Sequence, residues 1–189
     1  RGLFVMAHPG SHPDARPGLE PAIAHDRRVT WIIHGQAVHS NWTRIGDLER
    51  LLDRHPNLYY TLDIIESLPE FFALMKRLDP RSGGDFLRTM NRDFDLLLER
   101  MVSTWKGAIE RHPDRFLWGT DMALPHWHWH ASVMDKIMEF SRAFIGRLEP
   151  GAAEQYAYRN AERLLGECRY AADVPVPIDV RPGSFPNTI

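Results

Sequence analysis

The sequence lacks the features that commit a chain to a disulfide framework, a membrane or a polyanionic partner. Cys168 is the one cysteine in 189 residues, so no internal disulfide can form, which fits a reducing compartment. No apolar run approaches the roughly 20 residues that a membrane-spanning helix needs. The net charge of −2 gives no reason to expect nucleic acid or an anionic membrane as a partner. We therefore expect a cytoplasmic protein that binds neither.

Four short apolar runs are present, and each is followed at once by a residue that can bind a metal or move a proton. Runs of this kind are typical of strands that are buried on both faces of a parallel sheet. The stretches between them are long enough for a helix each, so the chemistry falls at the C-terminal ends of strands, as in a (β/α)-barrel active site. The runs are 3–7 before His8, 29–33 before His34, 58–62 before Asp63 and 116–120 before Asp121.

Apolar residues at helical spacing predict helices between and after these strands. The longest is expected over 85–112, directly before the last strand. We expect residues 1–167 to form an α/β domain, and the proline-rich residues 168–189 to form an extended tail. The other expected helices cover 17–28, 67–78, 131–148 and 151–166, with one more that begins after Thr43.

His8, His34 and Asp121 are the strongest candidates for a functional site, because each ends its own strand and histidine is a poor helix cap. Imidazole and carboxylate ligands from separate strand ends suit Zn²⁺ or another divalent ion that keeps one open position. Asp121 could equally act as a general base on metal-bound water. For Asp63, capping of the next helix is favoured over a functional role.

The remaining histidines fall into two groups according to their position along the chain. Residues 126–130 contain three histidines in a loop after the last strand, and His128 of this loop is a candidate for contact with a substrate. Arg81, in the loop segment 79–84, is a second candidate. His55 and His112 each belong to an Arg-His-Pro motif that closes a helix and begins a strand. This puts both at the N-terminal ends of strands, where residues of a barrel serve stability.

Five short segments make the chain resemble the C-terminal half of the amidohydrolase-related metal-dependent hydrolases. That group includes the aminocarboxymuconate-semialdehyde and resorcylate-type decarboxylases. The resemblance covers residues 1–167 and implies strands five to eight of a (β/α)8 TIM barrel, with a long helix before the last strand. The segments are Phe-Val-Met-Ala-His-Pro-Gly (4–10), Trp-Ile-Ile-His-Gly (31–35), His-Pro-Asn-Leu-Tyr (55–59), Pro-Asp-Arg-Phe-Leu-Trp-Gly-Thr-Asp (113–121) and Asn-Ala-Glu-Arg-Leu-Leu-Gly (160–166).

The resemblance implies a role for each of the three strongest candidates. His8 corresponds to the metal ligand of strand five, and Asp121 to the aspartate of strand eight that binds the metal and handles protons. His34 corresponds to the histidine of strand six, which polarises the substrate or the metal-bound water. The expected metal is Zn²⁺, and the expected reaction is hydrolysis of a C–N or C–O bond in a small molecule by metal-activated water.

Two alternatives stay open at this point: a non-oxidative decarboxylase of the same fold, and a non-catalytic barrel scaffold or binding domain. The His-x-His pair of strand one and the first four strands of the family have no counterpart in this sequence. We expect them to precede residue 1, and we expect this chain alone to be inactive. The apolar, proline-rich tail suggests a homodimer.

Overall fold

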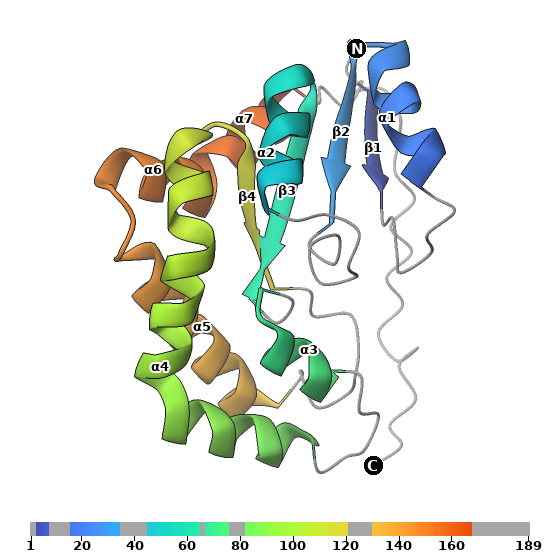
Figure 1. The fold of residues 1–189 in the computed structure, drawn as a ribbon. Helices are drawn as coiled ribbons and strands as arrows, with labels where there is room; N and C mark the ends of the chain where they lie inside the picture. Colours follow the sequence, from blue (N-terminus) through green and yellow to red (C-terminus); the bar gives the residue numbers. More distant parts are fainter. Residues whose placement is uncertain are drawn as a thin grey trace, which may run out of the picture.

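Four parallel strands form the centre of the protein, whose structure is a computed structural model that describes residues 3–7, 16–34, 45–64, 67–75, 82–120 and 130–167. The strands lie in one sheet in the order β1-β2-β3-β4, which is also their order along the chain (Figure 1). All four predicted strands are confirmed, with ends that differ from the prediction by at most one residue. They are β1 (Leu3–Ala7), β2 (Val29–Ile33), β3 (Leu58–Asp63) and β4 (Phe116–Gly119).

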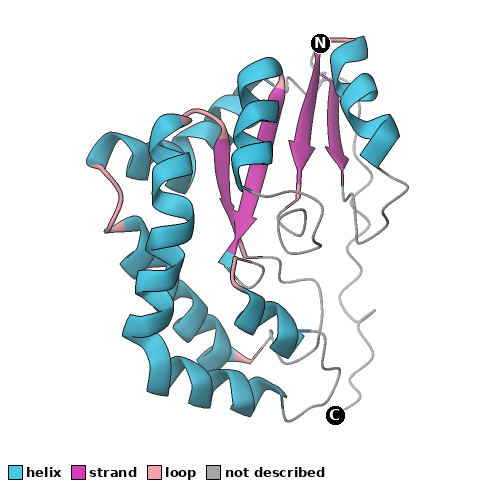
Figure 2. Cartoon of the chain, viewed as in Figure 1, coloured by secondary structure: helices cyan, strands magenta, loops and turns pink. Residues whose placement is uncertain are grey.

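Helices follow every strand, as the apolar spacing predicted (Figure 2). The long helix before β4 begins at Ser82, and a non-helical residue, Asp93 (φ −116°, ψ 16°), divides it by a kink. No described helix is long and apolar enough to cross a membrane. The helices are α1 (Arg16–His25), α2 (Ile45–Arg54), α3 (Pro69–Met75), α4 (Ser82–Arg111), α5 (Ala131–Ile145), α6 (Pro150–Glu154), the π-helix η5 (Gln155–Arg159) and α7 (Asn160–Glu167).

One face of the sheet carries the main hydrophobic core and is covered by α1, α2, α4 and α5. Ile33, Tyr60 and Phe116 lie side by side in register, so their side chains point to this face together. The Tyr60 ring stacks on Trp105 of α4, with 5.7 Å between ring centroids. Each such buried side chain contributes about 1.5–3 kcal/mol, so the core fixes the helices on the sheet. Buried helix residues include Ile23, Leu48, Leu52, Met101, Trp105, Ile137, Phe140 and Phe144.

The opposite face, which we call the second face, is apolar near the N-terminal ends of the strands. Ile32, Tyr59 and Leu117 form a separate cluster there with Leu164 of α7. Side chains alternate between the two faces along a strand, and each of these three strand residues is next in sequence to a residue of the main core. Their side chains therefore point to the second face. Helix α7 therefore lies on a different face from the helices that connect the strands, an arrangement that the sequence did not predict.

The second face becomes polar toward the C-terminal ends of the strands. Thr61 and Asp63 of β3 follow Tyr59 at intervals of two, and Gly119 lies beside Asp63 in register. His34, two residues after Ile32, belongs to the same side of the sheet by the same alternation. The strand ends thus bring chemically active side chains together on one face.

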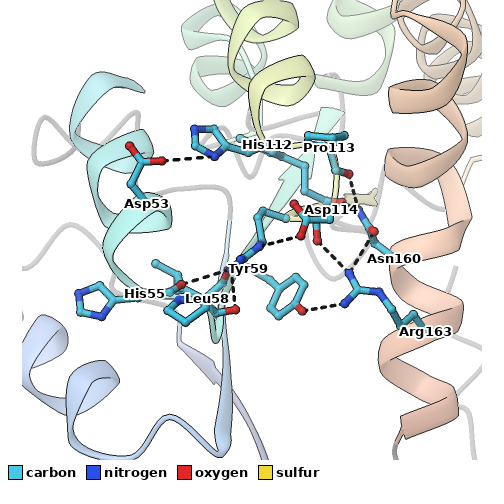
Figure 3. Close-up of polar contacts among 12 residues, drawn as sticks. Asp53, His55, Leu58, Tyr59, His112, Pro113, Asp114, Asn160 and Arg163 are labelled. Carbon is cyan, nitrogen blue, oxygen red and sulfur yellow. Dashed lines mark hydrogen bonds and ion pairs between the residues drawn. The ribbon is translucent and has the colours of Figure 1, made fainter.

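The outer edge of β4 is covered by the C-terminal helices. The Arg115 carbonyl accepts a hydrogen bond from the Tyr60 amide (2.9 Å), so the next carbonyl, that of Phe116, points away from β3. The side-chain amide of Asn160, which is fully buried, donates to Phe116 O (2.9 Å) and to Pro113 O (2.8 Å; Figure 3). These two bonds satisfy carbonyls that the edge strand would otherwise leave unpaired.

The predicted fold class is confirmed at the level of an α/β structure with a parallel four-stranded sheet. The tail predicted over 168–189 lies outside the described residues.

Candidate functional site

The site begins with two side chains from neighbouring strand ends, His34 after β2 and Asp63 at the end of β3. The backbone N–H of His34 donates to Ala7 O at the end of β1 (3.0 Å), which continues the pairing of β1 and β2 by one residue. The Thr61 hydroxyl donates to Ile33 O at 3.5 Å, between β3 and β2. A backbone hydrogen bond to β1 therefore holds His34 itself, and a side-chain hydrogen bond from β3 holds the residue before it.

The side chains of His34 and Asp63 form a buried contact between an imidazole and a carboxylate. Nε2 of the imidazole lies 2.9 Å from Oδ2 of the carboxylate, and the two side chains are 13% and 4% exposed. Among the described residues Oδ2 nevertheless accepts no hydrogen bond, so the contact has the distance of a hydrogen bond without its alignment. Electrostatic attraction between the two side chains therefore requires a protonated imidazole. This favours a functional role for Asp63, the interpretation that sequence analysis ranked below helix capping.

Gly119 makes room for the Asp63 carboxylate. A Cβ atom placed on Gly119 would overlap Oδ1 of Asp63, so any side chain at this position would push the carboxylate away. Sequence reasoning identified the Trp-Gly-Thr-Asp segment but assigned no role to the glycine. The role depends on the register of β3 and β4, which a sequence pattern does not reveal.

Tyr156 of the π-helix η5 supports the site from the helix-covered side. Its hydroxyl donates to Leu62 O at 3.0 Å, the carbonyl just before Asp63. Burial and, to a smaller extent, the negative charge of Asp63 raise the pKa of Tyr156 well above its usual range. The hydroxyl is thus a neutral donor that holds the end of β3 and is unsuited to act as a base. Sequence analysis missed Tyr156, because π-helical turns have no simple sequence signal.

Of the predicted site residues, His34 alone lies within the described residues. His8, Arg81, Asp121 and His128 lie outside them, although His8 directly follows Ala7 and Asp121 directly follows Thr120 in the sequence. Within the described ranges no group of three or more His, Cys, Asp or Glu side chains is arranged to hold a metal ion.

The two histidines predicted to have structural roles lie at the N-terminal ends of their strands, as expected. The backbone N–H groups of His55 and His112 donate to Leu51 O (3.0 Å) and Ala108 O (3.1 Å), each closing the last turn before a strand. The His55 ring Nε2 lies 3.2 Å from Glu20 Oε1. The two occurrences of the motif therefore form the same turn.

A groove of about 480 Å³ lies between α2 and the end of α4, at this N-terminal end. Its charged side chains pair with one another: Arg111 donates to Glu49 (2.7 Å), and His112 Nδ1 lies 3.8 Å from Asp53 Oδ1 (Figure 3). The groove therefore offers paired surface charges and no buried reactive group. It is lined by Gly46, Glu49, Arg50, Asp53, Arg111 and His112.

No family model, curated protein or solved structure matches this chain.

Proposed function

We propose that the protein is a metal-dependent hydrolase built on half of a (β/α)-barrel, in which His34 polarises the substrate or the attacking water. The observation that carries the proposal is the buried His34–Asp63 pair at the C-terminal ends of two parallel strands. Burying a carboxylate costs several kcal/mol of desolvation, and a carboxylate that tolerates this cost at a strand end is a candidate for function.

The topology supports a barrel. Each strand pairs with the next one in sequence, and the helices between strands pack on one face. Strands that advance in one direction with their helices on one side are the repeating unit of a barrel, in which the other face turns inward. The second face, with His34, Asp63 and Gly119, would then line the interior at its catalytic end.

The proposed metal ligands are His8 and Asp121, which follow the ends of β1 and β4 in the sequence. The described part of this edge supplies one imidazole and one carboxylate, and these face each other. A metal would therefore need ligands from outside the described ranges. Bound zinc would supply an acidic water or polarise a carbonyl. His34, whose Nε2 faces Asp63, would act beside the metal rather than bind it through that nitrogen.

Metal analysis of the full-length gene product tests the proposal. We expect stoichiometric zinc in the wild type, its loss in His8→Ala and Asp121→Asn, and its retention in His34→Ala. His130→Ala, at an exposed histidine before α5, is the matched control and should keep its zinc. Zinc that stays stoichiometric in both His8→Ala and Asp121→Asn would refute the ligand assignment, and a full-length protein without any metal would favour a non-catalytic scaffold.

A further inference from the structure

The Asp63 carboxylate is buried beside one basic side chain among the described residues, the imidazole of His34. We propose that Asp63 is a positioning residue that holds the His34 imidazole in its protonated, cationic form at the C-terminal end of β2. The catalytic consequence rests on the proposed function, whereas the charge of His34 can be measured without any substrate.

The Asp63 carboxylate needs a compensating charge. A carboxylate removed from water costs several kcal/mol unless a cation or several N–H donors compensate it. The Asp63 side chain is 4% exposed, and its Oδ2 accepts no hydrogen bond from the part of the chain that the structure describes. Nε2 of His34, 2.9 Å away, is then the compensating group, and it compensates a full negative charge when the ring is protonated.

The other described groups that face Asp63 supply no positive charge. Tyr156, from η5, is the other titratable side chain whose electrostatic interaction with Asp63 is resolved, and its raised pKa keeps it neutral. No lysine or arginine of the described residues forms an ion pair with Asp63. Within the described part of the chain, the burden of compensation therefore falls on His34.

The absence of a side chain at Gly119 leaves the space that the Asp63 carboxylate occupies. A methyl group at Gly119 would overlap Oδ1 of Asp63, so Gly119→Ala would displace the carboxylate and leave both members of the pair chemically unchanged. This gives a way to weaken the pair that differs in kind from removing the charge of Asp63.

A cationic His34 has a definite use in the proposed reaction. An imidazolium donates hydrogen bonds and stabilises negative charge that develops on a carbonyl or leaving-group oxygen, and it cannot accept a proton from water. The substrate class would then be a carbonyl compound whose oxygen becomes more negative in the transition state. Activity should fall as pH rises through the titration of His34.

Titration of the His34 ring by NMR in the full chain tests the inference, with the resonance assigned from His34→Gln. We expect the wild-type midpoint to lie about one pH unit or more above those of Asp63→Asn and Gly119→Ala. Asp53→Asn and Gly166→Ala are the controls, since Asp53 is exposed and Gly166 has open space around it, and both should keep the wild-type midpoint.

A wild-type midpoint below about 6.5, the value of an unperturbed imidazole, would overturn the inference even if no variant folds. Unchanged midpoints in folded Asp63→Asn and Gly119→Ala would overturn it as well. Metal content separates this result from the proposed function. Stoichiometric zinc with an unshifted His34 would refute the inference alone, and a raised midpoint without metal would refute the hydrolase proposal alone.

Discussion

The two ends of the sheet hold the same chemical pair, histidine beside carboxylate, in different electrostatic settings. At the N-terminal end, Glu20 lies 3.2 Å from His55 and also pairs with Arg54 at 2.8 Å. At the C-terminal end, Asp63 lies 2.9 Å from His34 and has no arginine partner among the described residues. A carboxylate that is already paired with an arginine does not require a protonated histidine to compensate its charge, whereas Asp63 does.

His112 repeats the N-terminal arrangement. Its Nε2 lies 3.8 Å from Glu49, and Glu49 accepts a hydrogen bond from Arg111 at 2.7 Å. These histidines also close helix turns through their backbones, so their positions follow from the fold rather than from a reaction. The comparison teaches that a histidine–carboxylate contact alone does not identify a site. Its burial, and the lack of another counter-charge among the described residues, distinguish the C-terminal pair.

The largest expected effect at the N-terminal end follows from Asn160. Asn160→Ala removes two hydrogen bonds, one to the buried Phe116 carbonyl and one to the partly buried Pro113 carbonyl. We therefore expect a loss of about 3 kcal/mol in the free energy of unfolding. Urea denaturation measures it. Asn91→Ala, at an exposed position of α4, is the control and should change stability by at most about 0.5 kcal/mol. A loss below about 1 kcal/mol at Asn160 would contradict a stability role for this end.

The next effect probes the C-terminal end through Tyr156. Because folding raises the pKa of this residue, the unfolded chain releases its proton first above about pH 10, and stability must fall as pH rises from there. Wild type should therefore lose about 1 kcal/mol more than Tyr156→Phe between pH 10 and 11, with a slope that approaches about 1.4 kcal/mol per pH unit at higher pH. Urea denaturation across pH 8–11 measures the slopes.

Tyr158→Phe is the matched control for this slope, since Tyr158 belongs to the same π-helix but is 45% exposed. It should follow the wild-type pH dependence. Parallel curves for wild type and Tyr156→Phe would contradict the burial of a neutral hydroxyl beside Asp63.

The strands and most helices could be predicted from the sequence because their signals are local. A short apolar run between breakers defines a buried strand wherever it occurs, and the long helix predicted over 85–112 differs from α4 by three residues at its start and one at its end. The kink at Asp93 could not be predicted, since neither proline nor glycine occurs there.

The site was only half predictable, because its contacts join segments that are far apart in sequence. His34 and Asp63 were both assigned to strand ends, but their contact requires β2 and β3 to be neighbours in a particular register. The space at Gly119 and the hydroxyl of Tyr156 depend on the same packing. A pattern along the chain identifies which residues end strands, and through-space neighbours decide what those residues do.

The smallest expected effect comes from making the same substitution, aspartate to asparagine, at both ends of the sheet. It compares the two ends directly. Asp53 lies 3.8 Å from His112 and its side chain is 68% exposed, so Asp53→Asn should change the free energy of unfolding by less than about 0.5 kcal/mol. Asp63→Asn should cost about 1 kcal/mol or more at pH 6, since it removes the counter-charge of a buried imidazolium. Urea denaturation of both variants under identical conditions measures the difference. Equal effects of the two substitutions on the free energy of unfolding would mean that Asp63 has no special energetic role, although it is buried and has no arginine partner among the described residues.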